Sequence, residues 1–116
     1  MDIIKQYDTW PYLTFTFTDE DDLPVDCRDF TVELRIKNRL DEVIVDAEVG
    51  GVEGGAVWID EDGGVGEYHW QAGDTDIQGL HSYEFKFTRL ADGAVFRLPQ
   101  DDYFYYEVHD SIYTGS

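Results

Sequence analysis

The stretch FTVELRIK, residues 30–37, places an apolar side chain at every second position, with polar or charged side chains between them. An alternation with a period of two is typical of a β-strand that has one face in a hydrophobic core and the other in water. The same period recurs in YLTFTFT, residues 12–18, and in LHSYEFKFTRL, residues 80–90. These three segments predict an all-β fold.

Turn signals separate further strands, which are predicted at residues 42–49, 56–60, 65–71, 94–99 and 103–108. The dipeptide Asp92-Gly93 predicts a two-residue hairpin turn in which both residues have positive φ. A chain of about seven short strands with no helical period favours an antiparallel immunoglobulin-like β-sandwich over a small barrel. We expect a single domain over residues 1–109 and a short C-terminal tail at 110–116.

The composition is strongly acidic. The 116 residues include 26 Asp and Glu against 8 Lys and Arg, which gives a formal net charge of -18 at pH 7. This charge repels the phosphates of nucleic acid and the anionic surface of a membrane, so we expect neither as a partner. The sequence begins without a basic leader before an apolar run, and it contains no run of about eighteen apolar residues, so we expect neither an export signal nor a membrane span.

The acidity arises as much from missing lysine as from added carboxylate, because the only lysines are Lys5, Lys37 and Lys86. This bias is typical of proteins from a high-salt cytoplasm, where screening over about 3 Å at 1 M salt relieves the repulsion between like charges. An acidic protein from an ordinary cytoplasm is the alternative.

The densest set of groups that could perform chemistry lies in YHWQAGDTDIQGLHSYEFKF, residues 68–87. It sets His69 and His81 around Asp74 and Asp76, but the two histidines lack the spacing of zinc ligands, and the strand pattern places them on opposite faces. A serine nucleophile would need a histidine and an orienting acid beside it, and none of the three serines meets this condition. We therefore predict no catalytic residue, no metal ligand and no cofactor.

The segment DEDGG, residues 60–64, resembles the beginning of a calcium-binding loop. Such a loop needs a bidentate glutamate about six residues after its glycine and helices on both sides, whereas a strand is predicted to begin at Val65. The sequence therefore favours a hairpin turn.

Aromatic residues are abundant, and most of them alternate into the predicted core. The last strand is unusual because it is apolar or aromatic on both faces, which a strand buried only by its own core does not require. Tyr and Trp are enriched in protein interfaces, so these residues predict a partner-binding surface. The residues predicted for this surface are Trp58, Tyr103, Tyr105 and Tyr113.

Three segments together resemble the N-terminal domain family of the phage baseplate upper protein. They are KQYDTWPYLTFTFTDEDDLPVDCRDFTVELRIKN (5–38), GVGEYHWQAGDTDIQG (64–79) and ADGAVFRLPQDDYFYYEV (91–108). The resemblance extends from about Ile4 to His109 and is strongest at Tyr68 and Trp70, which precede GDT. The chain departs from the family pattern at His81, where members usually place a tyrosine.

Members of this family are immunoglobulin-like modules in the virions of tailed viruses. The resemblance implies a non-enzymatic structural protein in a virion assembled in the host cytoplasm, acting as a tail or baseplate assembly or adaptor module, with no cofactor. Its implied partners are other virion proteins and copies of itself in a symmetric homo-oligomer. The salt-adapted composition suggests a virus of a halophilic archaeon.

Several alternatives remain open at this point. A free-standing module of this kind could serve as a capsid decoration or turret, or as a head–tail connector. A module that binds host glycans could stack sugars on Trp58, Tyr103 or Tyr105. A small hydrolase is the third alternative.

In antibody-like sandwiches, a tyrosine hydroxyl near the start of one strand bonds to backbone a few residues upstream and fixes the corner between two strands. The equivalent corner of this chain contains Asp74, Asp76, His81 and Tyr83. We expect Asp74 or Asp76 to accept bonds from nearby backbone N–H groups. We expect His81, or Tyr83 in a different register, to make the bond that fixes the corner.

Overall fold

A computed structural model describes residues 2–52, 54–99 and 103–110 of the chain. Within these residues the chain forms nine β-strands and one 3₁₀ turn, η1 (Cys27–Asp29). The strands are β1 (Asp2–Lys5), β2 (Leu13–Thr16), β3 (Phe30–Lys37), β4 (Val43–Glu48), β5 (Ala56–Asp60), β6 (Val65–Tyr68), β7 (Gly79–Arg89), β8 (Val95–Leu98) and β9 (Phe104–His109). The described residues include no helix that is long and apolar enough to cross a membrane.

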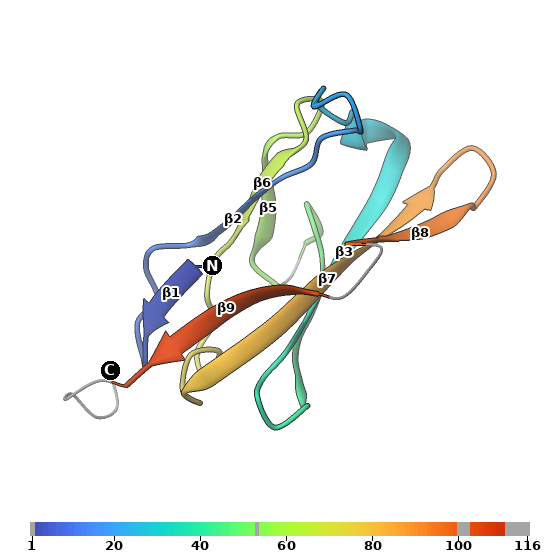
Figure 1. Ribbon diagram of the computed structural model, residues 1–116. Helices are drawn as coiled ribbons and strands as arrows, with labels where there is room; N and C mark the ends of the chain where they lie inside the picture. The colour runs from blue at the N-terminus through green and yellow to red at the C-terminus, as the bar shows by residue number, and fades with distance from the viewer. Residues whose placement is uncertain (1, 53, 100–102, 111–116) are drawn as a thin grey trace.

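The strands form two sheets, and Figure 1 shows β2, β5 and β6 in one layer across from β7, β9 and β3 in the other. The larger sheet has the order β1-β9-β7-β3-β4, with β8 also paired to β7, and the smaller sheet has the order β2-β6-β5. The strand pairs are antiparallel apart from β1 and β9, which run parallel. The predicted immunoglobulin-like β-sandwich is confirmed.

Two features of the larger sheet add to the predicted set of strands, namely the way β8 and β9 share one edge of β7 and the presence of β1. Residues 85–88 of β7 pair with β8, and residues 79–83 pair with β9. β8 and β9 thus act as one long partner of β7 that is interrupted between Leu98 and Phe104. The other feature is β1, because the sequence pattern predicted no strand before residue 12.

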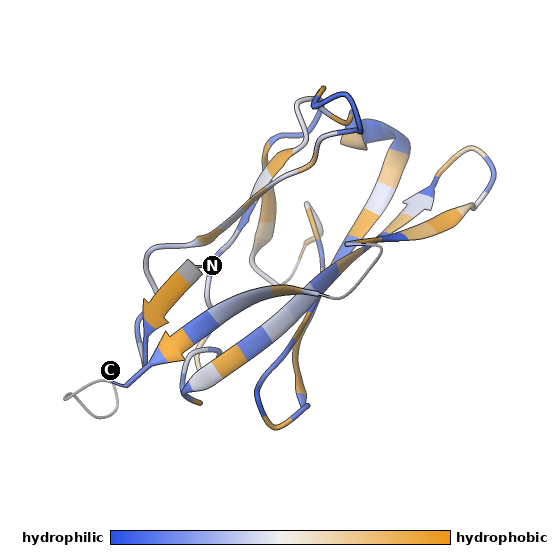
Figure 2. Cartoon of the chain, viewed as in Figure 1, coloured by the Kyte–Doolittle hydropathy of each residue, from blue (hydrophilic) through white to orange (hydrophobic). Residues whose placement is uncertain are grey.

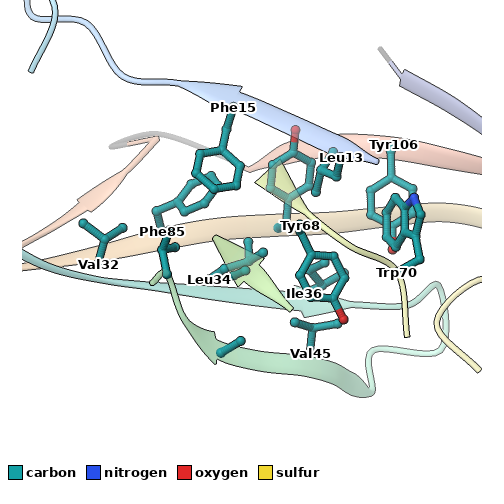
Figure 3. Packing of buried hydrophobic residues seen from close by; sticks show 14 of the residues in the cluster. Leu13, Phe15, Val32, Leu34, Ile36, Val45, Tyr68, Trp70, Phe85 and Tyr106 are labelled. Atoms are coloured by element: carbon teal, nitrogen blue, oxygen red, sulfur yellow. The ribbon is translucent and has the colours of Figure 1, made fainter. Parts of the chain in front are cut away.

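The alternation seen in the sequence places the core between the two sheets. Inward positions of β7 are buried and the positions between them are partly exposed, which Figure 2 shows as alternating bands along the strand. Burying a side chain the size of Leu or Phe stabilises the fold by about 1.5–3 kcal/mol. Figure 3 shows the buried side chains that meet between the sheets, among them Leu13, Phe15, Val32, Leu34, Ile36, Tyr68 and Phe85.

The turn between β7 and β8 differs from the predicted two-residue hairpin. The N–H of Arg89 donates to the carbonyl of Ala94, and the N–H of Gly93 donates to the carbonyl of Arg89, both at 2.8 Å. The loop therefore spans residues 90–93, and of the Asp92-Gly93 pair only Gly93 has a positive φ, 74°. The side chain of Asp92 accepts the N–H of Ala94 at 3.0 Å, so Asp92 stabilises the turn through its carboxylate and not through a positive φ.

Candidate functional site

The corner between β6 and β7, residues 69–78, is organised around the buried side chain of Asp74. Its Oδ2 atom accepts the hydroxyl of Tyr68 at 2.5 Å and the backbone N–H of Gln71 at 2.8 Å. Burial raises the pKa of Asp74, and the bonds from Tyr68 and Gln71 partly oppose this rise. Burial also raises the pKa of Tyr68, so its hydroxyl remains a donor to Asp74. The pair closes the turn, and both of its side chains are buried.

His81 is completely buried at the start of β7. Its Nε2 lies 2.8 Å from the carbonyl oxygen of Ile77, which can only accept, so Nε2 carries the proton and donates. The other nitrogen, Nδ1, then accepts the hydroxyl of Tyr106 at 3.2 Å. Burial lowers the pKa of His81, which keeps the imidazole neutral in this arrangement.

Of the two residues expected to fix the corner, His81 bonds to the backbone four residues upstream, at Ile77. Tyr83 is also buried, and its ring packs against Phe104, with a centroid separation of 5.4 Å, and against Phe85 at 6.0 Å. A histidine thus makes the bond that a tyrosine hydroxyl makes in antibody-like sandwiches.

The corner is also joined to the segment between β1 and β2. The hydroxyl of Thr75 donates to the carbonyl of Asp8 at 2.9 Å, and the N–H of Tyr7 donates to the carbonyl of Thr75 at 3.1 Å. The carbonyl of Asp76 accepts from the side chain of Gln6 at 2.6 Å, while the Asp76 side chain is exposed. Of the two aspartates expected to accept backbone N–H groups, the buried Asp74 does so, from Gln71.

The predicted separation of the histidines is confirmed. His69 directly follows β6 and is partly exposed; its ring stacks on Tyr12 with centroids 3.9 Å apart, and its Nε2 lies 2.7 Å from the Glu67 carboxylate. In the part of the chain that the structure describes, no three His, Cys, Asp or Glu side chains are grouped to hold a metal ion. Residues 60–64 form the hairpin turn between β5 and β6, in which the Asp60 carboxylate accepts the N–H of Gly63 at 3.3 Å.

The residues predicted as one partner-binding surface lie in different places. Trp58 belongs to β5 of the smaller sheet, and its half-buried ring packs edge-on against Phe15 and Phe17, with centroids 6.3 Å apart in each case. Trp58 is therefore on the opposite sheet from Tyr103 and Tyr105, and its role in partner contact stays a prediction. Tyr113 lies outside the described residues.

Tyr103 and Tyr105 belong to the outer face of the larger sheet, which we define as the side turned away from the smaller sheet. Tyr106 and Val108 of β9 are buried, so the residues between them point outward. Tyr103 is 46% exposed and borders a shallow hollow of about 160 Å³. The other residues around the hollow come from β3, β4 and β7: Arg35, Lys37, Val43, Ser82, Tyr83 and Glu84.

The outer face differs from the rest of the molecule in its charge. Its outward strand positions hold five of the eight basic residues and only five of the 26 acidic residues. The basic set is Lys5, Arg35, Lys37, Lys86 and Arg97, and the acidic set is Glu33, Asp46, Glu48, Glu84 and Glu107. The face is thus formally neutral, and the whole net charge of -18 lies elsewhere on the molecule.

The charges on this face are arranged across neighbouring strands. Arg35 lies between Asp46 of β4 and Glu84 of β7, and its Nη2 is 3.0 Å from the Asp46 carboxylate. Lys86 and Arg97 occupy directly opposed positions on β7 and β8, where like charges disfavour each other. Sequence reasoning considered only the aromatic residues and missed this balance, although the outward positions of residues 30–37 and 80–90 already contain three of the basic residues.

The comparisons with known proteins add no assignment. No protein-family model matches the chain, and no curated protein matches it.

Proposed function

We propose that this protein is a non-enzymatic structural protein of a tailed-virus virion, in which it acts as a tail or baseplate assembly or adaptor module. The resemblance over Ile4 to His109 supports this proposal, and so does the immunoglobulin-like sandwich that the resemblance implies. The partners are other virion proteins and further copies of the chain, without nucleic acid or membrane. The protein is assembled into the particle in the host cytoplasm.

The observation that carries the proposal is the neutral outer face of the larger sheet in a molecule of charge -18. Two such molecules repel each other in most orientations, and this face is where a neighbour can approach at the lowest electrostatic cost. Lys86 lies between Glu33 of β3 and Arg97 of β8, so the exposed Arg97 is the basic group to which an acidic group of a neighbour would add a favourable contact. Tyr103 supplies an exposed aromatic side chain beside these charges.

The acidic composition supports a salt-adapted host, with a virus of a halophilic archaeon as the specific proposal. At about 1 M salt or more, screening over about 3 Å removes most of the repulsion between copies. Repeated copies around a symmetry axis then make individually weak contacts collectively strong.

Sedimentation velocity in 2 M KCl tests the role of the outer face. We expect the purified protein to form a defined oligomer, and the double variant Lys86→Glu, Arg97→Glu to be monomeric at the same concentration. The matched control is Arg28→Glu, Arg89→Glu, which changes the net charge equally at exposed sites away from the strand positions of the outer face. Equal association of the two double variants would show that the outer face is not the contact between copies.

Mass spectrometry of purified particles tests the virion assignment separately, and absence of the protein from them would contradict it.

The hollow beside Tyr103 favours a host-glycan-binding module as the second candidate. It combines an aromatic ring with the hydroxyl of Ser82 and the charges of Arg35 and Glu84, and sugars are bound by such combinations of stacking and hydrogen bonds. Titration of the monomeric variant with host envelope sugars separates the candidates. Saturable binding that is lost in Tyr103→Ala would favour the glycan-binding module. Absence of saturable binding would favour the assembly module.

A further inference from the structure

A second surface lies at the opening between the two sheets, where β1 of the larger sheet faces β2 of the smaller one (Figure 1). It is a groove of about 270 Å³. Its lining is mostly apolar and includes residues of the hydrophobic core. The residues that line it are Ile3, Ile4, Pro11, Tyr12, Leu13, Thr14, Trp70 and Tyr106.

One side of this groove is an unpaired strand edge. In the described part of the chain β2 pairs only with β6. The N–H of Phe17, just after β2, donates to the carbonyl of Gly64 toward β6 at 2.8 Å. Backbone groups of successive residues in an antiparallel strand point to opposite sides, so those of Thr14 and Thr16 point away from β6, toward the open edge.

The open edge of β2 carries no charged side chain, although the strand is only four residues long and Pro11 lies just before it. Residues 12–18 contain no charged side chain, whereas 29% of the whole chain is charged. The edge strand β4 of the larger sheet presents Asp46 and Glu48, and β8 presents Arg97. Proteins protect exposed edges with charges, prolines or bulges, and an edge without them is a template for another strand. The rim adds exposed apolar surface, since Ile3 is 58% exposed and Trp10, next to the lining residue Pro11, is 71% exposed.

We propose that this groove binds an extended segment of a partner protein, which pairs with β2 as an added strand and places alternate apolar side chains against Ile4, Leu13 and Trp70. The volume of about 270 Å³ is below the usual range for drug-sized ligands, roughly 300–1,000 Å³, and suits one or two side chains. Strand addition obtains affinity from main-chain hydrogen bonds and specificity from the pockets that receive alternate side chains.

The charges around the groove indicate the chemistry of the segment. Asp8 lies in the segment before β2, and the acidic run of residues 19–22 follows the strand, so the chain carries carboxylates on both sides of β2. The segment therefore carries Lys or Arg at its ends, with apolar residues at alternate positions between them. A second copy of this chain fits less well, because its own β2 buries Leu13 and Phe15 in its own core and would leave the groove empty.

Of the residues that line the groove, only Ile3 occupies an outward position of the larger sheet, so this inference does not depend on the proposed self-association through Lys86 and Arg97. The probe is a synthetic peptide with blocked ends, Lys-Ile-Thr-Ile-Thr-Ile-Lys, titrated into the full chain and followed by tryptophan fluorescence. We expect saturable binding that weakens about tenfold when Asp replaces the terminal Lys residues. Two further peptides carry methyl groups on alternate backbone nitrogens, one on each edge of the extended peptide. Only one of these two peptides should lose binding, because only one edge of the peptide faces β2.

Hydrogen exchange identifies the site of binding. The N–H groups of Thr14 and Thr16 should gain protection when the peptide binds, while those paired with β6 should not change. The variant Ile3→Asp should weaken binding about tenfold, and the matched control Ile59→Asp, at a residue 60% exposed on β5, should not. Absence of saturable binding, or equal binding of both methylated peptides, would overturn the proposal. The N–H groups of Thr14 and Thr16 could instead be protected from exchange without peptide, to a degree that increases with protein concentration. That result would show that a second copy occupies the edge of β2, and it would overturn the choice of partner.

Discussion

The corner between β6 and β7 and the outer face of the larger sheet both contain many polar groups, but in opposite settings. Asp74 and His81 are buried in the corner, where each bonds to specific neighbours at fixed positions in the chain. The charges of the outer face are exposed or half-buried, and the Arg35 and Asp46 side chains that pair there are each 54% exposed. The corner holds most of the groups that suggested chemistry in the sequence, and the outer face holds the groups that remain accessible to a partner.

This difference shows how a buried polar cluster differs from a binding surface. A buried polar group is costly without a partner, so its bonds serve the fold first. Exposed ion pairs contribute about 0–1 kcal/mol each, so their arrangement is free to serve recognition. Changes in the corner should therefore affect stability, and changes on the outer face should affect association.

Asp74→Ala should have the largest effect. It leaves the Tyr68 hydroxyl and the Gln71 N–H buried without their acceptor, which should lower the free energy of unfolding by about 3 kcal/mol. Urea denaturation measures this loss. Asp76→Ala is the matched control two residues away, and its exposed carboxylate should be worth less than about 0.5 kcal/mol. Similar losses in both variants would mean that the corner does not depend on Asp74.

His81→Leu should have the next largest effect, a loss of about 2 kcal/mol, because the carbonyl of Ile77 and the hydroxyl of Tyr106 lose their partner. His109→Leu is the control, since that side chain is 40% exposed at the end of β9. A stable His81→Leu protein would show that the corner is fixed by the turn around Asp74 alone.

The same variant tests the protonation of His81. Its pKa is lowered in the folded state, so below about pH 6.5 the unfolded chain binds a proton that the folded chain does not, and stability falls as the pH falls. The slope should not exceed about 1.4 kcal/mol per pH unit and should be absent from the corresponding profile of His81→Leu. Urea denaturation between about pH 5 and 8 measures the stability of both proteins as a function of pH. Subtracting the profile of His81→Leu from that of the unchanged protein removes the contribution of Asp74, which both proteins share, and leaves that of His81.

Salt should have the smallest effect on stability, and it distinguishes the two regions. Raising KCl from about 0.1 M to 2 M shortens the screening length from about 10 Å to a few ångströms, which relieves repulsion between surface carboxylates and should stabilise the protein by about 1 kcal/mol. Thermal unfolding should show a higher melting temperature in 2 M KCl. The loss caused by Asp74→Ala should be the same at both salt concentrations, because its bonds are buried. A flat or falling melting temperature would contradict the proposal of a salt-adapted protein.

Much of the sandwich was predictable because the alternation in residues 30–37 and 80–90 directly reports which side chains face the core. β1 was not predictable in this way. Its four residues lie beside β9, with Asp2 opposite Tyr106, and a parallel pair between segments about one hundred residues apart leaves no local signal. The separation of β8 from β9 was predictable, because each segment by itself has the pattern of a strand.

The candidate sites show a similar division. The turn chemistry of Asp74 and the inward direction of His81 follow from local rules, so the sequence pointed to both. The bond from Tyr68 to Asp74 was not foreseen, because the pattern assigned Tyr68 to the core without identifying a partner for its hydroxyl. The sequence grouped Trp58 with Tyr103 and Tyr105 without a signal for which sheet each belongs to, and the fold places Trp58 on the smaller sheet.

The parallel pair of β1 and β9 also determines how the sandwich responds to mechanical force. The two strands lie side by side from the Asp2–Tyr106 pair to the Lys5–His109 pair, and both run in the same direction. Tension applied at the first residue of β1 and the last residue of β9 pulls the strands past each other along their length. The hydrogen bonds between them are then loaded together in shear, and not broken one after another as they would be if the strands were peeled apart. A module held in series within a particle that is stretched or contracted would bear that load through this pair.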